Sequence, residues 1–98
     1  MTQIQRITQM EDYLNQSAAV VNALAQALED YLAIQPQLQA LSDYYGSSQW
    51  YDDLADDEAG RLPSELRRGV LSEDGIYNML MDHQQLLTSL KHLLGSDN

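Results

Sequence analysis

The residues best able to do chemistry lie between Tyr44 and Asp74, where acidic and aromatic side chains are concentrated. A close group of carboxylates could hold a hard cation or face a basic surface. An EF-hand loop sets its oxygen ligands at alternate positions and has Gly at the sixth. Counted from Asp52, the third position is Leu54 and the sixth is Asp57, so that pattern fails. A less regular cation site remains the lesser alternative, and no cofactor is predicted. The acidic group is Asp52, Asp53, Asp56, Asp57 and Glu58.

The other ingredients of catalysis are scarce. The chain has no Cys, and its two histidines, His83 and His92, lie nine positions apart and so do not share a helix face. No Gly-rich phosphate loop, Ser-His-Asp set or zinc-ligand spacing occurs. His83 falls within an apolar stripe, which favours a packed, hydrogen-bonded histidine over a catalytic base or a ligand. The sequence therefore predicts a protein that is not an enzyme.

Two adjacent arginines, Arg67 and Arg68, follow the acidic group. They could bind an anion together with the N-terminus of the next helix. Among so many carboxylates, internal ion pairs with Asp52, Asp53 or Asp56 are favoured, and these would tie the segment to that helix.

Four aromatic residues lie beside the acids, and we assign them to two environments. Aromatic side chains both fill small helical cores and serve as anchors at protein interfaces. We expect Tyr45 and Trp50 in the core, with Trp50 buried against the ends of the first and second helices. Tyr44 and Tyr51 are expected at the surface. The predicted partner-binding patch is Tyr44, Tyr51, Asp52, Asp56, Asp57 and Glu58.

The overall charge limits the classes of partner. The chain has a formal net charge of −10 and a pI near 4.1, a field that repels nucleic acid and anionic membranes and attracts basic proteins. No apolar run approaches the roughly 20 residues that span a bilayer. These features predict a soluble, cytoplasmic protein. The alternative reading of the charge is that it provides solubility and nothing more.

The elements that position these residues are helical. Residues 2–34 carry apolar side chains at a spacing of seven, with others three or four positions away, which predicts a long amphipathic helix. Pro36 and Gly46 bound a second helix over about residues 36–45. Residues 46–71 are expected to form an ordered acidic, aromatic loop, and a third helix follows over about residues 72–94. The repeating positions of the first helix are Ile7, Leu14, Val21 and Leu28, with Ile4, Met10, Leu24 and Tyr31 between them.

The predicted fold is therefore all-α. Residues 1–98 form a single helical domain, an antiparallel helical hairpin or three-helix bundle of two long helices and a shorter one. The third helix is too short to cover the apolar stripe of the first, so a homodimer is an alternative way to bury the remainder.

Several short segments carry a family resemblance. They are Arg6-Ile7 with Met10-Glu11, Tyr44-Tyr45-Gly46-Ser47, Trp50 with Asp53, Leu62-Pro63, and Gly69-Val70-Leu71-Ser72-Glu73-Asp74 before Tyr77. In these the chain resembles a family of small bacterial proteins catalogued as domain of unknown function number 4298, over nearly its whole length. The resemblance implies a compact all-α domain and brings no known activity, cofactor or catalytic residue.

The expected function is that of a non-enzymatic, acidic protein-binding module. Its charge and size suit an inhibitor or immunity-type protein that neutralises a basic partner, by analogy and without a motif. The alternative is a structural homodimer or adaptor built on the apolar stripe of the first helix.

Overall fold

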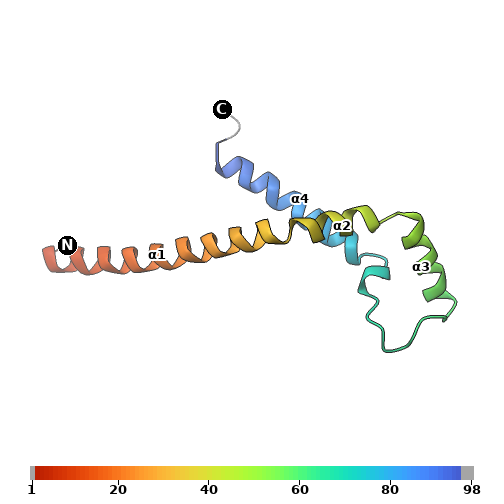
Figure 1. The fold of residues 1–98 in the computed structure, drawn as a ribbon. Coiled ribbons are helices and arrows are strands. Elements are labelled where there is room, and N and C mark those ends of the chain that lie inside the picture. The colour runs from red at the N-terminus through yellow and green to blue at the C-terminus, as the bar shows by residue number, and fades with distance from the viewer. Residues whose placement is uncertain (1, 96–98) are drawn as a thin grey trace. The chain divides into compact units, whose positions relative to one another are not determined.

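The part of the protein that the structure describes, residues 2–95 of a computed structural model, is built from helices joined by turns and irregular segments (Figure 1). Its elements are the α-helices α1 (Gln3–Ala33), α2 (Gln35–Tyr44), α3 (Ser48–Glu58) and α4 (Gly75–Leu93), and the short 3-10 helix η1 (Gly69–Leu71). No strand occurs within residues 2–95. The all-α prediction is confirmed. None of these helices has the combination of length and apolar content that crossing a membrane requires.

The chain divides into two units, Met1–Pro36 and Gln37–Asn98. The first unit is essentially α1. Thr2 caps this helix: its side-chain oxygen accepts the Gln5 amide at 3.1 Å, and the Gln5 side chain accepts the Thr2 amide at 3.0 Å. Such a reciprocal capping box satisfies two amides that otherwise have no partner in the helix. The helix lies within the predicted span of residues 2–34, and none of its residues is buried.

The second unit contains a helix that the sequence analysis predicted as part of a loop. Gly46, at φ 79°, ends α2 in the left-handed conformation that glycine adopts without strain. Ser47 then caps α3, because its hydroxyl accepts the Trp50 amide at 3.2 Å. Trp50 and Leu54 lie one helical turn apart and form the inner face of α3. The loop prediction for residues 46–71 is therefore wrong over Ser48–Glu58. The many acidic residues of this segment suggested a loop, although Ser47 is a helix cap and Trp50 and Leu54 have helical spacing.

The core of the second unit is small and centres on Trp50. Trp50, Leu71 and Ile76 are the buried hydrophobic residues of the described chain, at 9%, 7% and 4% exposure. The indole N–H of Trp50 donates to the Val70 carbonyl at 2.9 Å, and its ring meets the Tyr45 ring edge-on at 5.1 Å. Burial of Trp50 is confirmed, and so is the predicted packing of the core against the end of the second helix, through Leu41, Tyr44 and Tyr45. The partly buried hydrophobic residues around the core are Leu41, Tyr44, Tyr45, Leu54, Leu62 and Leu80.

The start of α4 is built by one serine side chain. The Ser72 hydroxyl donates to the Gly69 carbonyl at 2.7 Å and accepts the Gly75 amide at 3.0 Å. The helix begins at Gly75 and not at residue 72, and its N-cap position is Asp74, which makes no side-chain cap hydrogen bond. Ser72 therefore holds the turn that precedes the helix. A Cβ on Gly75 would collide with the Gly69 carbonyl oxygen and approach the Ser72 hydroxyl to 2.6 Å. Only glycine fits this turn without a shift of the backbone.

Candidate functional site

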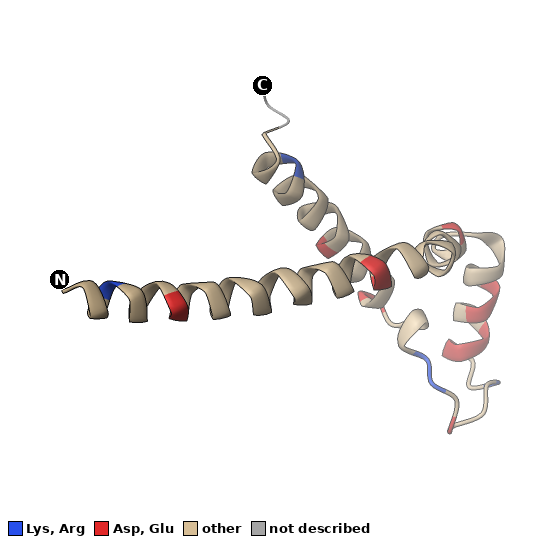
Figure 2. Ribbon diagram, turned by 60° about the vertical axis from the view of Figure 1, so that its left-hand side comes forward, with Lys and Arg blue, Asp and Glu red and all other residues tan. Residues whose placement is uncertain are grey.

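The candidate site is α3, where five carboxylates fall within two helical turns. Figure 2 shows the acidic residues gathered along this helix. Positions 52 and 56 lie one turn apart, as do positions 53 and 57, so four of the carboxylates form two rows, and Glu58 lies one turn after Leu54. Because Trp50 and Leu54 turn inward, one row lies next to the core and the other faces outward. The two rows have different neighbours, and these decide what each can do.

Asp53, on the inner row, is bound to a tyrosine. The Tyr44 hydroxyl donates to the Asp53 carboxylate at 2.6 Å, which ties the end of α2 to α3. This hydrogen bond, together with burial and the charge of Asp53, raises the pKa of Tyr44 to about 12. Tyr44 was expected at the surface as a contact residue. It is instead half-buried against the core, because its hydroxyl has an internal acceptor.

Two further carboxylates form ion pairs within the second unit. Arg68 pairs with Asp57 at 2.7 Å, and Arg61 pairs with Asp56 at 2.8 Å. Internal pairing of the arginines was predicted, but Asp52, Asp53 and Asp56 were named as partners. That assignment is wrong for Arg68, whose place beside η1 brings it to Asp57. The Arg68 pair is the more sheltered, with 37% and 23% of the two side chains exposed, against 69% and 45% for the Arg61 pair.

Two acids of α3, Asp52 and Glu58, have no internal partner in the described chain. Within residues 2–95, neither Asp52 nor Glu58 makes a side-chain hydrogen bond or an ion pair, and both are exposed. Tyr51 precedes them and is 59% exposed. Its ring is held edge-on against Trp50, with centroids 5.1 Å apart and an interplanar angle of 69°. Of the six predicted patch residues, the structure therefore leaves three available: Tyr51, Asp52 and Glu58.

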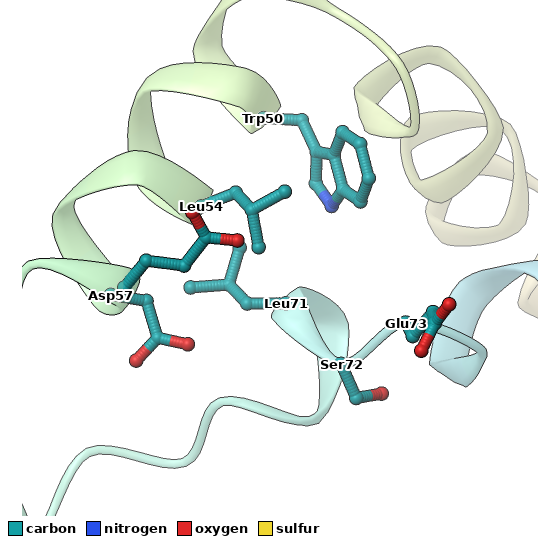
Figure 3. A pocket seen from close by; sticks show the side chains of 7 residues that line it. Trp50, Leu54, Asp57, Leu71, Ser72 and Glu73 are labelled. Atoms are coloured by element: carbon teal, nitrogen blue, oxygen red, sulfur yellow. The ribbon is translucent and has the colours of Figure 1, made fainter.

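A cavity of about 400 Å³ adjoins this face, between α3, η1 and the turn before α4 (Figure 3). Trp50, Leu54 and Leu71 give it an apolar base, as Figure 3 shows. Its polar lining consists of Asp57, Glu58, Ser72 and Glu73. Sequence reasoning missed Ser72 and Glu73 as site residues. The signal available was the Gly69–Asp74 segment, whose tight turn carries Glu73 to the lining of the cavity.

The second unit has another hollow, on the other side of η1. It measures about 410 Å³ and is mainly apolar, with Arg67 as its one charged residue. It is lined by Leu41, Arg67, Gly69, Val70, Gly75, Ile76 and Met79. Arg67, predicted to pair with a carboxylate, makes no ion pair within residues 2–95.

The metal-site alternative can be compared with this geometry. Among residues 2–95, no three His, Asp or Glu side chains are grouped as metal ligands would be. Asp53, Asp56 and Asp57 are instead engaged by Tyr44, Arg61 and Arg68, respectively.

Comparison with known proteins adds a family and no function. The family model described as "Domain of unknown function (DUF4298)" matches residues 7–92, well over half of the chain. The chain belongs to this family. The resemblance stated from the sequence is thereby confirmed. No curated protein and no solved structure matches the chain.

Proposed function

We propose that this DUF4298 protein is a non-enzymatic binding module whose α3 contacts a basic protein surface. The observation that carries the proposal is the state of Tyr51: a large side chain that is 59% exposed yet in edge-on contact with the buried Trp50 ring. An aromatic ring held in place loses little conformational freedom on binding, which is why such rings serve as interface anchors. Asp52 and Glu58 flank it on the same helix and have no internal partner within residues 2–95.

The charges around this anchor support a cationic partner. Arginines pair with Asp56 and Asp57, and Asp53 lies on the inner row with Tyr44 as its donor. The unpaired charge available to a partner therefore comes chiefly from Asp52 and Glu58, and from Glu73 across the cavity. A lysine or arginine side chain has an apolar stem and a charged head. The cavity offers both counterparts, an apolar base and carboxylates in its lining. The proposed contact residues are therefore Tyr51, Asp52, Glu58 and Glu73, in place of the wider set predicted from the sequence.

In this proposal the protein is cytoplasmic and acts as an inhibitor or immunity-type protein for a basic partner. The net charge of −10 supports it, because opposite charge speeds the encounter of two proteins before they make contact.

The test is the salt dependence of association with the partner recovered from the host. Asp52→Lys/Glu58→Lys should slow association about tenfold or more at low salt, and the difference should narrow at high salt. The matched control is Asp12→Lys/Asp82→Lys, which makes the same change in net charge at exposed positions outside the site. If both double variants associate at the same rate, the charge acts as a whole and α3 is not the binding face.

A second candidate function, a structural homodimer or adaptor, is supported by α1. None of its residues is buried, and its apolar stripe includes Leu14, Val21 and Leu24, each more than 60% exposed. Such a stripe calls for a partner helix. The partner helix would be α4, in the antiparallel hairpin of the predicted three-helix bundle, or α1 of a second copy of the chain. The mass of the protein in solution separates these two possibilities.

A further inference from the structure

The spacing of the α1 stripe fits the seam of a coiled coil. In heptad terms, Ile7, Leu14, Val21 and Leu28 occupy the first core position. Met10, Ser17, Leu24 and Tyr31 occupy the second. The seam thus runs through four heptads without a break in spacing. None of these side chains is buried, since α1 contains no buried residue.

The length of the seam indicates what could cover it. At about 1.5 Å per residue, the 31 residues of α1 extend over about 46 Å. The 19 residues of α4, the next longest helix in the described chain, extend over about 28 Å. A helix of that length leaves more than a third of α1 without a partner in any arrangement. Within residues 2–95, only α1 is as long as the seam, so a second copy of α1 is the occupant that matches it.

The charges beside the seam set the direction of pairing. Arg6 and Glu11 are the charged residues at the two positions that flank it, and they lie five residues apart. Five residues is the offset at which flanking positions meet across a parallel, in-register pair. Arg6 would then face Glu11 of the second copy, and the twofold symmetry would give two such pairs. Arg6 makes no ion pair within residues 2–95, so it is available for this contact.

Antiparallel pairing offers nothing equivalent. When each first-position residue faces a second-position residue, Ile7 lies opposite Tyr31 of the other copy and Leu14 opposite Leu24. In that register Arg6 meets Ile34 and Glu11 meets Ala25, so neither charge has a partner. The parallel register also places the two Ser17 side chains side by side at the centre of the seam, where their hydroxyls can bond to each other.

We infer that α1 binds a second copy of itself as a parallel, in-register, two-stranded coiled coil, held by the seam and fixed in register by Arg6 and Glu11. This rests on the second candidate function, that the chain is a homodimer, and adds the surface, the direction and the register.

The first measurement is the mass of the full chain by sedimentation equilibrium. The wild type should be a dimer, and Val21→Asp/Leu24→Asp should be a monomer. Because neither residue is buried, the second unit should keep its fold, which the emission of Trp50 reports. A monomeric wild type would overturn both the homodimer and this inference, and a trimer or larger assembly would overturn the two-stranded form.

The second measurement tests direction, and it uses the absence of cysteine from the chain. Under mild oxidation, Met10→Cys should form an interchain disulfide, because parallel pairing brings position 10 next to its own copy. Antiparallel pairing would separate the two by about 27 Å, from 18 residues of helix. Ala19→Cys, on the outer face, is the control and should stay reduced. A dimer in which Met10→Cys does not cross-link refutes the parallel register and leaves the homodimer standing.

The third measurement tests the charged pair. Arg6→Glu and Glu11→Arg should each weaken self-association about tenfold at low salt, because each brings like charges together in both symmetric pairs. The double reversal should restore most of the loss. If the double variant is no tighter than the single ones, Arg6 and Glu11 do not meet across the dimer.

Discussion

Gly75→Ala should destabilise the protein, although the general rule for helices predicts the opposite. Gly75 is the first residue of α4, and replacing glycine with alanine in a helix ordinarily stabilises by about 0.5–1 kcal/mol. Here the new methyl group would collide with the Gly69 carbonyl oxygen and press on the Ser72 hydroxyl. The backbone carbonyl cannot move aside as a flexible side chain could.

The expected loss in the free energy of unfolding follows from the hydrogen bonds that must break to relieve the clash. Ser72 makes hydrogen bonds to the Gly69 carbonyl and to the Gly75 amide, and each contributes about 0.5–1.5 kcal/mol. Overpacking of this kind typically costs about 1–3 kcal/mol. We therefore expect a net loss of about 1–3 kcal/mol, or a fall in melting temperature of roughly 4–8 °C per kcal/mol.

Gly69→Ala is the matched control. Its added Cβ would meet nothing within 4 Å, so the free energy of unfolding should change by less than about 0.5 kcal/mol. Urea titration followed by Trp50 fluorescence measures both variants, since the indole is bonded to Val70 in the same 3-10 helix. If Gly75→Ala proves as stable as the wild type, the close approach of Gly75 to the Gly69 carbonyl is contradicted.

Three other predictions concern the second unit. Trp50→Phe should cost about 1–3 kcal/mol, measured by chemical denaturation, because it leaves a sheltered carbonyl without its donor. The Tyr44 phenol should ionise near pH 12, which a titration monitored by absorbance at 295 nm would show. The stabilisation from its hydrogen bond to Asp53 is fully present below pH 10, the ordinary pKa of tyrosine, and is lost as the pH rises through 12. Tyr44→Phe should remove that alkaline loss, and a phenol titrating near pH 10 in the wild type contradicts the bond. A double-mutant cycle of Asp57→Asn with Arg68→Ala should show a coupling of about 0.5–1 kcal/mol that falls with added salt, whereas zero coupling would show an exposed pair of no consequence.

The helices that follow a regular period were predictable from the sequence. The stripe of α1 and the Pro36 and Gly46 boundaries of α2 each act through neighbours within a few residues. Local signals of this kind are legible in a single sequence. The helix α3 was missed because its five acids suggest a solvated loop, and they outweighed Ser47 and the Trp50–Leu54 pair.

The candidate site was predictable only in part. The acidic and aromatic residues were identified, and so was the pairing of arginines with acids. Which acid meets which partner depends on how η1 and the turn after it fold back onto α3, and no spacing in the chain encodes that. Arg68 therefore finds Asp57, and Tyr44 bonds to Asp53 rather than facing solvent. Glu73 reaches the cavity through the same turn.

The small core has a consequence for how the backbone opens. Trp50, Leu71 and Ile76 are the buried hydrophobic residues of the described chain, and they all lie in the segment 50–76. Amide hydrogens leave the native state through local openings whose free energy depends on the contacts that must be given up. Amides of η1 and of the first turns of α4 should thus exchange most slowly with deuterium. Those of α1, where no buried contact holds the helix, should exchange quickly at low concentration. As protein is added, any slowing in α1 alone would measure directly how much of that helix's order comes from association.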